Sequence, residues 1–533
     1  MTSAINLVFL SLSRRAEASD REKLIQTFVD VGPLFALLSS SDHQIFYGRR
    51  GTGKTHALTY LADRRETAGD AVAYIDLRNV GSSAGMYSDQ SRSLAERATC
   101  LLVDALSAVH ESLLSYFIES ELAPDLARAG PSLDALADSI TEVRVVGSIE
   151  TEDLDRQEQG ASVSTGAAVD LGEKPSVKLR YDAAENTGSE RQTRVTRSGE
   201  ERLYVNFGST GAAFRRIAAE MGERRVWILL DEWSSIPAEL QPYLADLVRR
   251  SLLPTPGVTV KIAAIEQRSR FQLARADGDY VGIEVGADAS ADVNLDDFMV
   301  FDNDAERAKA FFRDLLYRHY QAATPSEPIQ SANEFIRRAF TQFRAFDEFV
   351  RASEGVPRDA INILGLSAQK AIDDPISIEH VRVAAKNWYQ RDKDTAVRAN
   401  QTAHDLLHWI IDEVIAGRRA RAFLLQSSVS DPIVEDLYDA RVLHVLKRGI
   451  STHDQPGIRY DAYKLDYGCY VDLISTAKAP IGLLPSDVPG PAPMFIEVPP
   501  DDYRSIRRAI LDLSKFRSAP HDESEKQAAP QAP

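Results

Sequence analysis

Residues 48–55 read Gly-Arg-Arg-Gly-Thr-Gly-Lys-Thr, which fits the phosphate-binding loop G-x-x-x-x-G-K-[ST] at every constrained position. The preceding residues 44–47, Gln-Ile-Phe-Tyr, predict a short buried strand, and residues 56–62 predict the helix that follows. Strand, loop and helix in this order are the context that such a loop requires. A nucleotide-binding site is therefore the first expectation for this chain.

The residue types of the loop suit a triphosphate. Gly48, Gly51 and Gly53 let the backbone turn tightly and point N–H groups at phosphate oxygens, with the positive end of the helix dipole behind them. Lys54 supplies a positive charge for the β and γ phosphates, and the Thr55 hydroxyl is placed to ligate Mg²⁺. The predicted nucleotide-binding residues are Gly48, Arg49, Arg50, Gly51, Thr52, Gly53, Lys54, Thr55 and His56. His56 is expected to pack or to face water on the helix and has no chemical role of its own.

A second signature lies in residues 226–232, where the apolar run Val-Trp-Ile-Leu-Leu ends in Asp231 and Glu232. Continuous apolar residues predict a strand buried on both faces, whose carboxyl end opens onto the ligand crevice of a parallel sheet. Asp231 is expected to hold Mg²⁺ through water, and Glu232 to polarise the water that attacks the γ phosphate. The alternative is a solvated strand end.

This Asp-Glu ending resembles the additional-strand, catalytic-glutamate division of P-loop NTPases. No guanine-reading N-K-x-D pattern stands out, so ATP is favoured over GTP. The next predicted strand, residues 258–265, ends in Glu-Gln-Arg-Ser-Arg at 266–270. In AAA+ ATPases, which this arrangement resembles, a polar residue here senses the γ phosphate. Gln267 is then the candidate, with Glu266 second, and Arg268 and Arg270 are candidate arginine fingers for a neighbouring subunit. The alternative is a surface turn with salt bridges.

A helical stretch from 304 to about 387 contains Gly-Val-Pro-Arg at 355–358. This helix start resembles the lid motif of the initiator clade of AAA+ ATPases, which includes origin-recognition and archaeal replication-initiator proteins, and that of the related signal-transduction ATPases. The resemblance implies that Arg358 reaches the γ phosphate from the lid; the alternative is a proline turn with a solvated arginine. The predicted catalytic residues are thus Glu232, Lys54, Gln267, Arg358 and Arg268, and the predicted metal ligands are Thr55 and Asp231.

The predicted fold is α/β: a P-loop NTPase parallel sheet with a helical lid and a C-terminal winged-helix-like domain. We expect the core in residues 1–303, the lid in 304–398, the winged-helix-like domain in 399–480, and an extension with a disordered tail in 481–533. The chain departs from the initiators in a polar, β-rich insertion at about 142–207 and in lacking a clear asparagine after the strand at 258–265. The insertion is either a surface element for a partner or a spacer.

The predicted recognition helix, residues 432–439, and its flank carry four acidic residues, Asp431, Glu435, Asp436 and Asp439. Phosphates would repel this face, so DNA contact would have to use the basic wing residues Lys447, Arg448, Arg459 and Lys464. The formal net charge of −17 also repels a polyanion at long range. We therefore expect protein or intramolecular packing ahead of DNA binding for this domain.

At 533 residues the chain is long enough for two or three domains, and its 44% hydrophobic and 26% charged residues are typical of soluble globular proteins. Its two cysteines, Cys100 and Cys469, argue against a disulfide framework or a structural zinc site. Apolar runs are far shorter than the roughly 18 residues of a membrane helix, so we expect a cytoplasmic protein with no membrane partner.

Two function classes follow, both with ATP and Mg²⁺ as cofactors. The first is an ATP-driven switch in DNA transactions or in defence against phage and mobile elements. The second is a signalling or scaffold ATPase whose insertion and C-terminal domain bind only protein effectors. In both classes a homo-oligomer is an open alternative, because the predicted arginine fingers would act between subunits.

Overall fold

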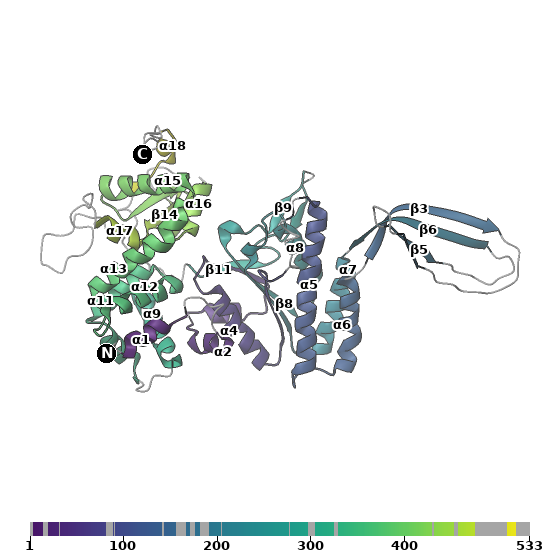
Figure 1. Cartoon of the computed structure of the whole chain (residues 1–533), viewed down its shortest axis with the longest axis horizontal. Helices are drawn as coiled ribbons and strands as arrows, with labels where there is room; N and C mark the ends of the chain where they lie inside the picture. Colours follow the sequence, from purple (N-terminus) through teal and green to yellow (C-terminus); the bar gives the residue numbers. More distant parts are fainter. Residues whose placement is uncertain are drawn as a thin grey trace, which may run out of the picture.

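The computed structural model describes residues 4–13, 20–30, 32–80, 89, 91–140, 143–155, 167–170, 176–181, 191–203, 205–276, 278–296, 304–323, 329–428, 431–451, 457–474 and 509–518. These residues form a core with a three-layer arrangement, a sheet that projects from it, a bundle of helices that we call the lid after the expectation from sequence, and a C-terminal domain (Figure 1).

The core contains a five-stranded parallel sheet of β1 (Gln44–Tyr47), β2 (Ala71–Asp76), β7 (Val226–Asp231), β8 (Val258–Ala264) and β11 (Ser290–Asn294). Its strand order is β11-β1-β8-β7-β2. The strand β8 therefore lies between the strand that leads into the phosphate loop and the strand that ends in Asp231. This is the additional strand that the sequence predicted, and the α/β fold class is confirmed.

The sequence predicts a final core strand near residues 293–300, and the strand in the structure begins earlier, at Ser290. Val293 and Leu295 are buried, and the chain leaves the sheet after Asn294 to bring Asp296 against Arg49. Residues 297–300 of the predicted strand lie outside the described residues.

Helices cover both faces of this sheet. Every residue of β7 and β8 is buried as a result. One face carries α4 (Lys54–Thr67), with α2 (Arg21–Thr27) and α3 (Leu34–Leu38) beside it. The other face carries α5 (Leu94–Glu119), α6 (Leu126–Ile140), α7 (Phe207–Met221) and α8 (Gln241–Leu247), which runs on as a π-helical turn, Val248–Leu252. A short hairpin of β9 (Gln272–Ala274) and β10 (Tyr280–Gly282) packs on α8.

By length and composition, α5 is the one described helix that could cross a membrane. Its buried residues, among them Leu101, Leu106 and Leu113, belong to the same apolar cluster as β7 and β8. In this structure α5 is thus a helix of the core.

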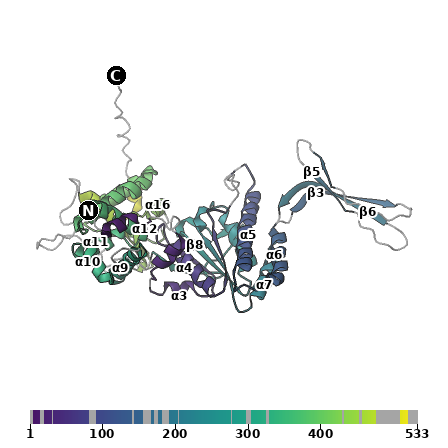
Figure 2. The same cartoon turned by 60° about the horizontal axis from the view of Figure 1, so that its bottom comes forward.

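The insertion forms an antiparallel sheet of β3 (Val143–Asp155), β4 (Ala167–Asp170), β5 (Ser176–Tyr181) and β6 (Arg191–Leu203) in the order β3-β6-β5-β4. The sequence of the insertion predicts short strands at 143–146 and 176–181; the second matches β5, and the first is the start of the longer β3. Figures 1 and 2 both show this sheet extending from the side of α6 and α7, at the end of the molecule opposite the lid.

The lid consists of α9 (Ala305–Ala322), α10 (Ala332–Ala339), α11 (Phe343–Ser353), α12 (Pro357–Ala371) and α13 (Ile378–Trp388). The N-terminal helix α1 (Ala4–Ser11) packs with them: the rings of Phe9 and Phe335 lie 5.8 Å apart, and the Asn6 amide donates to the Ile372 carbonyl at 2.8 Å. Residues 4–13 were predicted to belong to the core. Phe9 and Leu12 are instead buried in the lid cluster, with Ile5 and Val8 packed against it.

The C-terminal domain follows a π-helical turn, Tyr389–Lys393, and contains α14 (Asp394–Arg398), α15 (Gln401–Ile411), a second π-helical segment, Asp412–Gly417, and α17 (Tyr467–Ile474). Between α15 and α17 come β12 (Ala422–Gln426), α16 (Pro432–Asp439), β13 (Leu443–Ser451) and β14 (Arg459–Leu465), with the sheet order β12-β14-β13. For a winged-helix-like domain the sequence predicts a helix at 403–416, a short strand near 420–425, a helix at 432–439 and a hairpin of 443–450 with 458–465. The elements of this domain follow the same order.

Part of the predicted extension and tail is ordered on this domain. The Leu511 N–H donates to the Leu424 carbonyl at 2.9 Å, and Leu513 and Phe516 of α18 (Leu513–Ser518) are buried in the domain's apolar cluster. Residues 519–533 lie outside the described residues.

Candidate nucleotide site

Strand register brings the phosphate loop and the acidic pair to one edge of the sheet. Phe46 of β1 lies opposite Ala263 of β8, and Leu230 of β7 lies opposite Ile262 of β8. Asp231 is therefore level with Phe46, two residues before the loop begins at Gly48. Two strand spacings of about 5 Å each separate β1 from β7, so the gap is about 10 Å, enough for a phosphate, a metal ion and a water.

Two glycines give the loop its shape. Gly51 and Gly53 have φ values of 89° and 99°, in the region that other residues rarely adopt. A Cβ atom on Gly51 would also lie 2.6 Å from Cβ of Arg358. The Thr52 hydroxyl donates to the Arg49 carbonyl at 2.9 Å and holds the turn from inside. Position 51 thus requires glycine for its conformation and for the close approach of the lid.

Lys54 is buried at the start of α4, where its Nζ donates to the carbonyls of Gly48 at 2.8 Å and Arg49 at 3.1 Å. Burial lowers the pKa of Lys54, and the nearby carboxylates of Glu232 and Asp231 oppose that shift. The ammonium group therefore lies over the loop, within electrostatic reach of both acids.

Asp231 is fully buried and accepts hydrogen bonds from the Tyr74 hydroxyl at 2.7 Å and from the Glu232 N–H at 2.8 Å. Glu232 has φ 56° and ψ 39°, a left-handed conformation that costs a residue other than glycine roughly 1–2 kcal/mol. The chain turns out of the strand at this residue and enters a 3-10 turn, Trp233–Ser235. Strain of this kind gathers at functional sites.

Thr55 and Asp231 fit a magnesium ion held mainly by phosphate oxygens and water. Within the described part of the chain the Thr55 hydroxyl makes no hydrogen bond, and no group of three or more His, Cys, Asp or Glu could form a metal cage. Mg²⁺ typically uses one or two protein oxygens and keeps several waters. The donor set present here is of that kind.

The lid reaches the loop directly. The Arg358 N–H, in the first turn of α12, donates to the Gly51 carbonyl at 3.2 Å. The next residue, Asp359, is fully buried, accepts from the Trp388 indole N–H at 3.0 Å and pairs with Lys393 at 2.9 Å. Arg358 is therefore held at the loop by a rigid helix start.

The residues after β8 divide between the site and the C-terminal domain. Glu266, the second sensor candidate, forms a two-pronged ion pair with Arg448 of β13 at 2.9 and 2.8 Å. Arg268 pairs with Asp439 at the end of α16 of the same chain. The Oε1 of Gln267 is buried with no hydrogen-bond partner among the described residues. Of the two sensor candidates, Gln267 is the one with a polar atom to offer.

Arg49 has a place that the sequence did not predict. Its buried side chain binds Asp296 at 2.9 Å, the Leu443 carbonyl at 3.0 Å and Nδ1 of His444 at 3.2 Å, and lies over the Tyr438 ring at 4.5 Å. Its backbone N–H also donates to Asp296, at 2.9 Å. A residue predicted to bind nucleotide thus joins the loop to the C-terminal domain.

Arg50 and His56 were also among the predicted nucleotide-binding residues, with His56 expected to pack or to face water. Arg50 is exposed and lines a cavity beside the loop. His56 packs against α2, with its ring nitrogen at the Leu24 carbonyl and its ring 5.6 Å from that of Phe28, and burial lowers its pKa. His56 therefore faces away from the loop.

A buried network that sequence reasoning missed connects these parts. The Nε2 of His444 lies 3.0 Å from Asp466, which pairs with Lys393, the partner of Asp359. The positive partners lower the pKa values of Asp359 and Asp466 against the effect of burial. Asp296 could have been found from sequence, since it lies just beyond the end of β11, at the same edge of the parallel sheet as Asp231 at the end of β7. The other residues carry no local signal.

Among the comparisons with known proteins, the match to a family model is confined to the region around the phosphate loop. Residues 11–65, which contain the loop, match the family model described as ORC-CDC6-like. No curated protein matches the chain. Among solved structures, that of the Aeropyrum pernix ORC1 protein in complex with DNA is similar at 13% identity, covering 88% of this chain and 94% of that one with a TM-score of 0.31. A TM-score this low carries no argument about function.

Proposed function

We propose that this protein is a magnesium-dependent ATPase of AAA+ type that acts as a switch in DNA transactions of the replication-initiation kind. The observation that carries the proposal is the shared sheet edge. There the phosphate loop, the Asp231–Glu232 pair across β8, and the lid residue Arg358 meet. The match of residues 11–65 to the ORC-CDC6-like model supports the same proposal.

In this proposal, the chain binds and orients the triphosphate. Lys54 leaves the Gly48 and Arg49 carbonyls for the β and γ phosphates, and Arg358 binds the γ phosphate from the lid. Glu232 accepts a proton from the attacking water, and Gln267 orients the γ phosphate through its amide. When bound by Thr55 and, through water, by Asp231, Mg²⁺ supplies positive charge against the charge that develops on the phosphate oxygens.

The switch follows from the contacts that these elements make elsewhere. The loop touches the lid through Gly51 and the C-terminal domain through Arg49, while Arg268 and Glu266 touch the C-terminal domain from the end of β8. A nucleotide that moves Lys54, Arg358 or Gln267 acts on elements that also hold this domain. ATP binding and hydrolysis would then change how the domain docks.

Two variants test the proposal. Lys54→Ala should abolish ATP binding or turnover, and Glu232→Gln should bind ATP yet lose hydrolysis. Binding is measured by calorimetry and turnover by phosphate release, with Arg337→Ala, an exposed lid change, as the matched control. Normal turnover in Glu232→Gln would overturn the assignment of the base, and wild-type heat in Lys54→Ala would overturn the site itself.

A second candidate function is a signalling or scaffold ATPase whose C-terminal domain binds proteins. Two contacts favour it: the acidic helix α16 faces the core, with Asp439 on Arg268 and Tyr438 over Arg49, and the wing residues Arg448 and Lys464 pair with Glu266 and Glu354. Docked in this way, the predicted DNA-reading elements are engaged within the chain. Duplex DNA titrated at low and high salt separates the candidates. Affinity that falls steeply with salt supports the DNA role, and no binding at low salt excludes it.

A further inference from the structure

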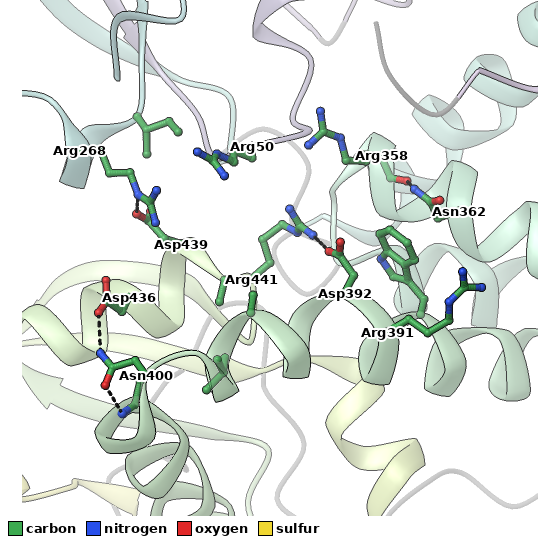
Figure 3. Close-up of a pocket in the computed structure, with 16 residues that line it drawn as sticks. Arg50, Arg268, Arg358, Asn362, Arg391, Asp392, Asn400, Asp436, Asp439 and Arg441 are labelled. Carbon is green, nitrogen blue, oxygen red and sulfur yellow. Dashed lines mark hydrogen bonds and ion pairs between the residues drawn. The ribbon is translucent and has the colours of Figure 1, made fainter. Parts of the chain in front are cut away.

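A cavity of about 670 Å³ lies where the core, the lid and the C-terminal domain meet. Figure 3 shows Arg50 of the loop, Arg268 after β8 and Arg441 after α16 approaching it from three elements. Lys54, Thr55, Asp231 and Glu232 do not line it. The cavity is therefore next to the proposed triphosphate site, shares Arg268 and Arg358 with its rim, and excludes the phosphate-loop lysine and the acidic pair.

The lining of this cavity carries an excess of positive charge. Five arginines face three aspartates: Arg50, Arg268, Arg358, Arg391 and Arg441 against Asp392, Asp436 and Asp439. Each aspartate is engaged already, since Asp392 pairs with Arg441, Asp439 with Arg268, and Asp436 accepts from the Asn400 amide at 3.3 Å. Arg50 and Arg391 form no ion pair with any described residue. Their guanidinium groups thus remain available to an anion.

Arg441, which lines the cavity, has a strained backbone conformation. This residue closes α16 with φ 62°, a left-handed position where glycine is the usual choice. Its side chain is buried between Asp392 and Asp359, lying 3.3 Å from the latter. A strained residue whose guanidinium lines a cavity points to a role for that side chain in the cavity.

We propose that this cavity binds a second, phosphate-bearing small molecule, distinct from the nucleotide on the phosphate loop. A volume of this size takes a ligand as large as a mononucleotide. Guanidinium groups suit phosphate because their planar donors bind its oxygens in pairs. Trp388 and Asn362 in the same lining offer an aromatic ring and an amide to whatever carries the phosphates. The ligand would bridge all three domains and so stabilise their docked arrangement.

The test uses the full chain with Lys54→Ala, which removes the lysine of the phosphate loop, and sodium tripolyphosphate as the probe in a calorimetric titration at low salt. We expect binding of one equivalent. The double variant Lys54→Ala with Arg391→Glu should bind tripolyphosphate at least tenfold more weakly, because a cation of the cavity is replaced by an anion. Arg391 is exposed, so the substitution should leave the fold intact. Arg337→Glu, an exposed charge reversal on the lid away from the cavity, should leave the affinity unchanged.

Three outcomes would overturn the proposal. The first is no heat with tripolyphosphate, and the second is equal weakening by Arg391→Glu and Arg337→Glu. The third is binding of a short single-stranded oligonucleotide that depends on Arg391 while tripolyphosphate does not bind, which would assign the arginines to nucleic acid. The titration contains no ATP, so a failure of the proposed ATPase activity would leave its result intact.

Discussion

The guanidinium group of Arg49 lies 3.2 Å from Nδ1 of His444, a residue 395 positions further along the chain. The other ring nitrogen of His444 lies 3.0 Å from Asp466. A neutral ring that accepts from Arg49 and donates to Asp466 satisfies both contacts. Through Lys393 the network continues to Asp359, the neighbour of Arg358. The phosphate loop and the lid arginine are thus joined through the C-terminal domain as well as by their direct contact.

Replacing Arg49 by leucine should destabilise the protein by about 3–5 kcal/mol, because Asp296 would be left buried without its partner. Chemical denaturation measures the loss, and protease protection of the C-terminal domain shows whether it undocks. Arg50→Leu, an exposed neighbour, should change stability by no more than about 0.5 kcal/mol. Equal effects of the two variants would contradict the role of Arg49, and the double change Arg49→Leu with Asp296→Asn should recover part of the loss.

Stability should fall as the pH drops from about 6.5 to about 4 because of His444. Burial lowers the pKa of His444 to about 4, whereas an unfolded histidine titrates near 6.5. In this window the unfolded chain binds a proton that the folded chain does not, which costs up to about 3 kcal/mol. His444→Gln has no imidazole to protonate at this position, so its stability lacks this pH-dependent loss. The difference in free energy of unfolding between wild type and variant should therefore change with pH in this window, and a constant difference would refute the assignment.

Two ion pairs between the C-terminal domain and the rest of the chain should differ in strength. Lys464 and Glu354 are 9% and 2% exposed, so Lys464→Met should cost about 3–5 kcal/mol by removing the cation beside a buried carboxylate. Arg448 and Glu266 are 46% and 35% exposed, so Arg448→Ala should cost less than about 1 kcal/mol and still less at high salt. Urea denaturation of both variants at two salt concentrations checks the order, which a larger loss in Arg448→Ala would reverse.

Arg358→Ala should lower kcat about 10²- to 10³-fold while ATP binding is weakened much less, because its charge is needed most as charge develops on the γ phosphate. Arg358→Lys should retain part of the activity. Steady-state kinetics together with calorimetric affinities separate the two effects. A variant that loses affinity and keeps kcat would show that Arg358 serves binding alone.

Asp439→Ala should raise turnover if Arg268 is the arginine finger, because the pair with Asp439 holds Arg268 within its own chain. The gain should depend on protein concentration, since the finger acts on a neighbouring subunit. Mixing Arg268→Ala with Lys54→Ala should then restore activity that neither has alone. Arg275→Ala, an exposed change on the same side of the core with no predicted role, is the control, and Arg270→Ala is tested beside Arg268→Ala as the other candidate finger. No gain in Asp439→Ala and no complementation would leave Arg268 a docking residue only.

Sequence patterns predicted the elements whose residues are contiguous. The strand at 44–47, the helix at 432–439 and the hairpin after it are found where the patterns indicated, and the Asp-Glu ending was enough to predict a strand between β1 and β7. The boundaries of β11 and the place of α1 were predicted wrongly, because both depend on packing partners far away in the chain.

The loop with its glycines, Lys54 and Thr55, and the acidic strand end, were determined by the sequence alone, because adjacent backbone N–H groups and a strand terminus create those sites locally. Only the tertiary structure decided that Arg49 binds the C-terminal domain, that Arg268 pairs with Asp439, and that five arginines line one cavity. A buried charge must be matched by whatever opposite charge the fold brings beside it, and residues hundreds of positions apart announce no such pairing in the chain itself.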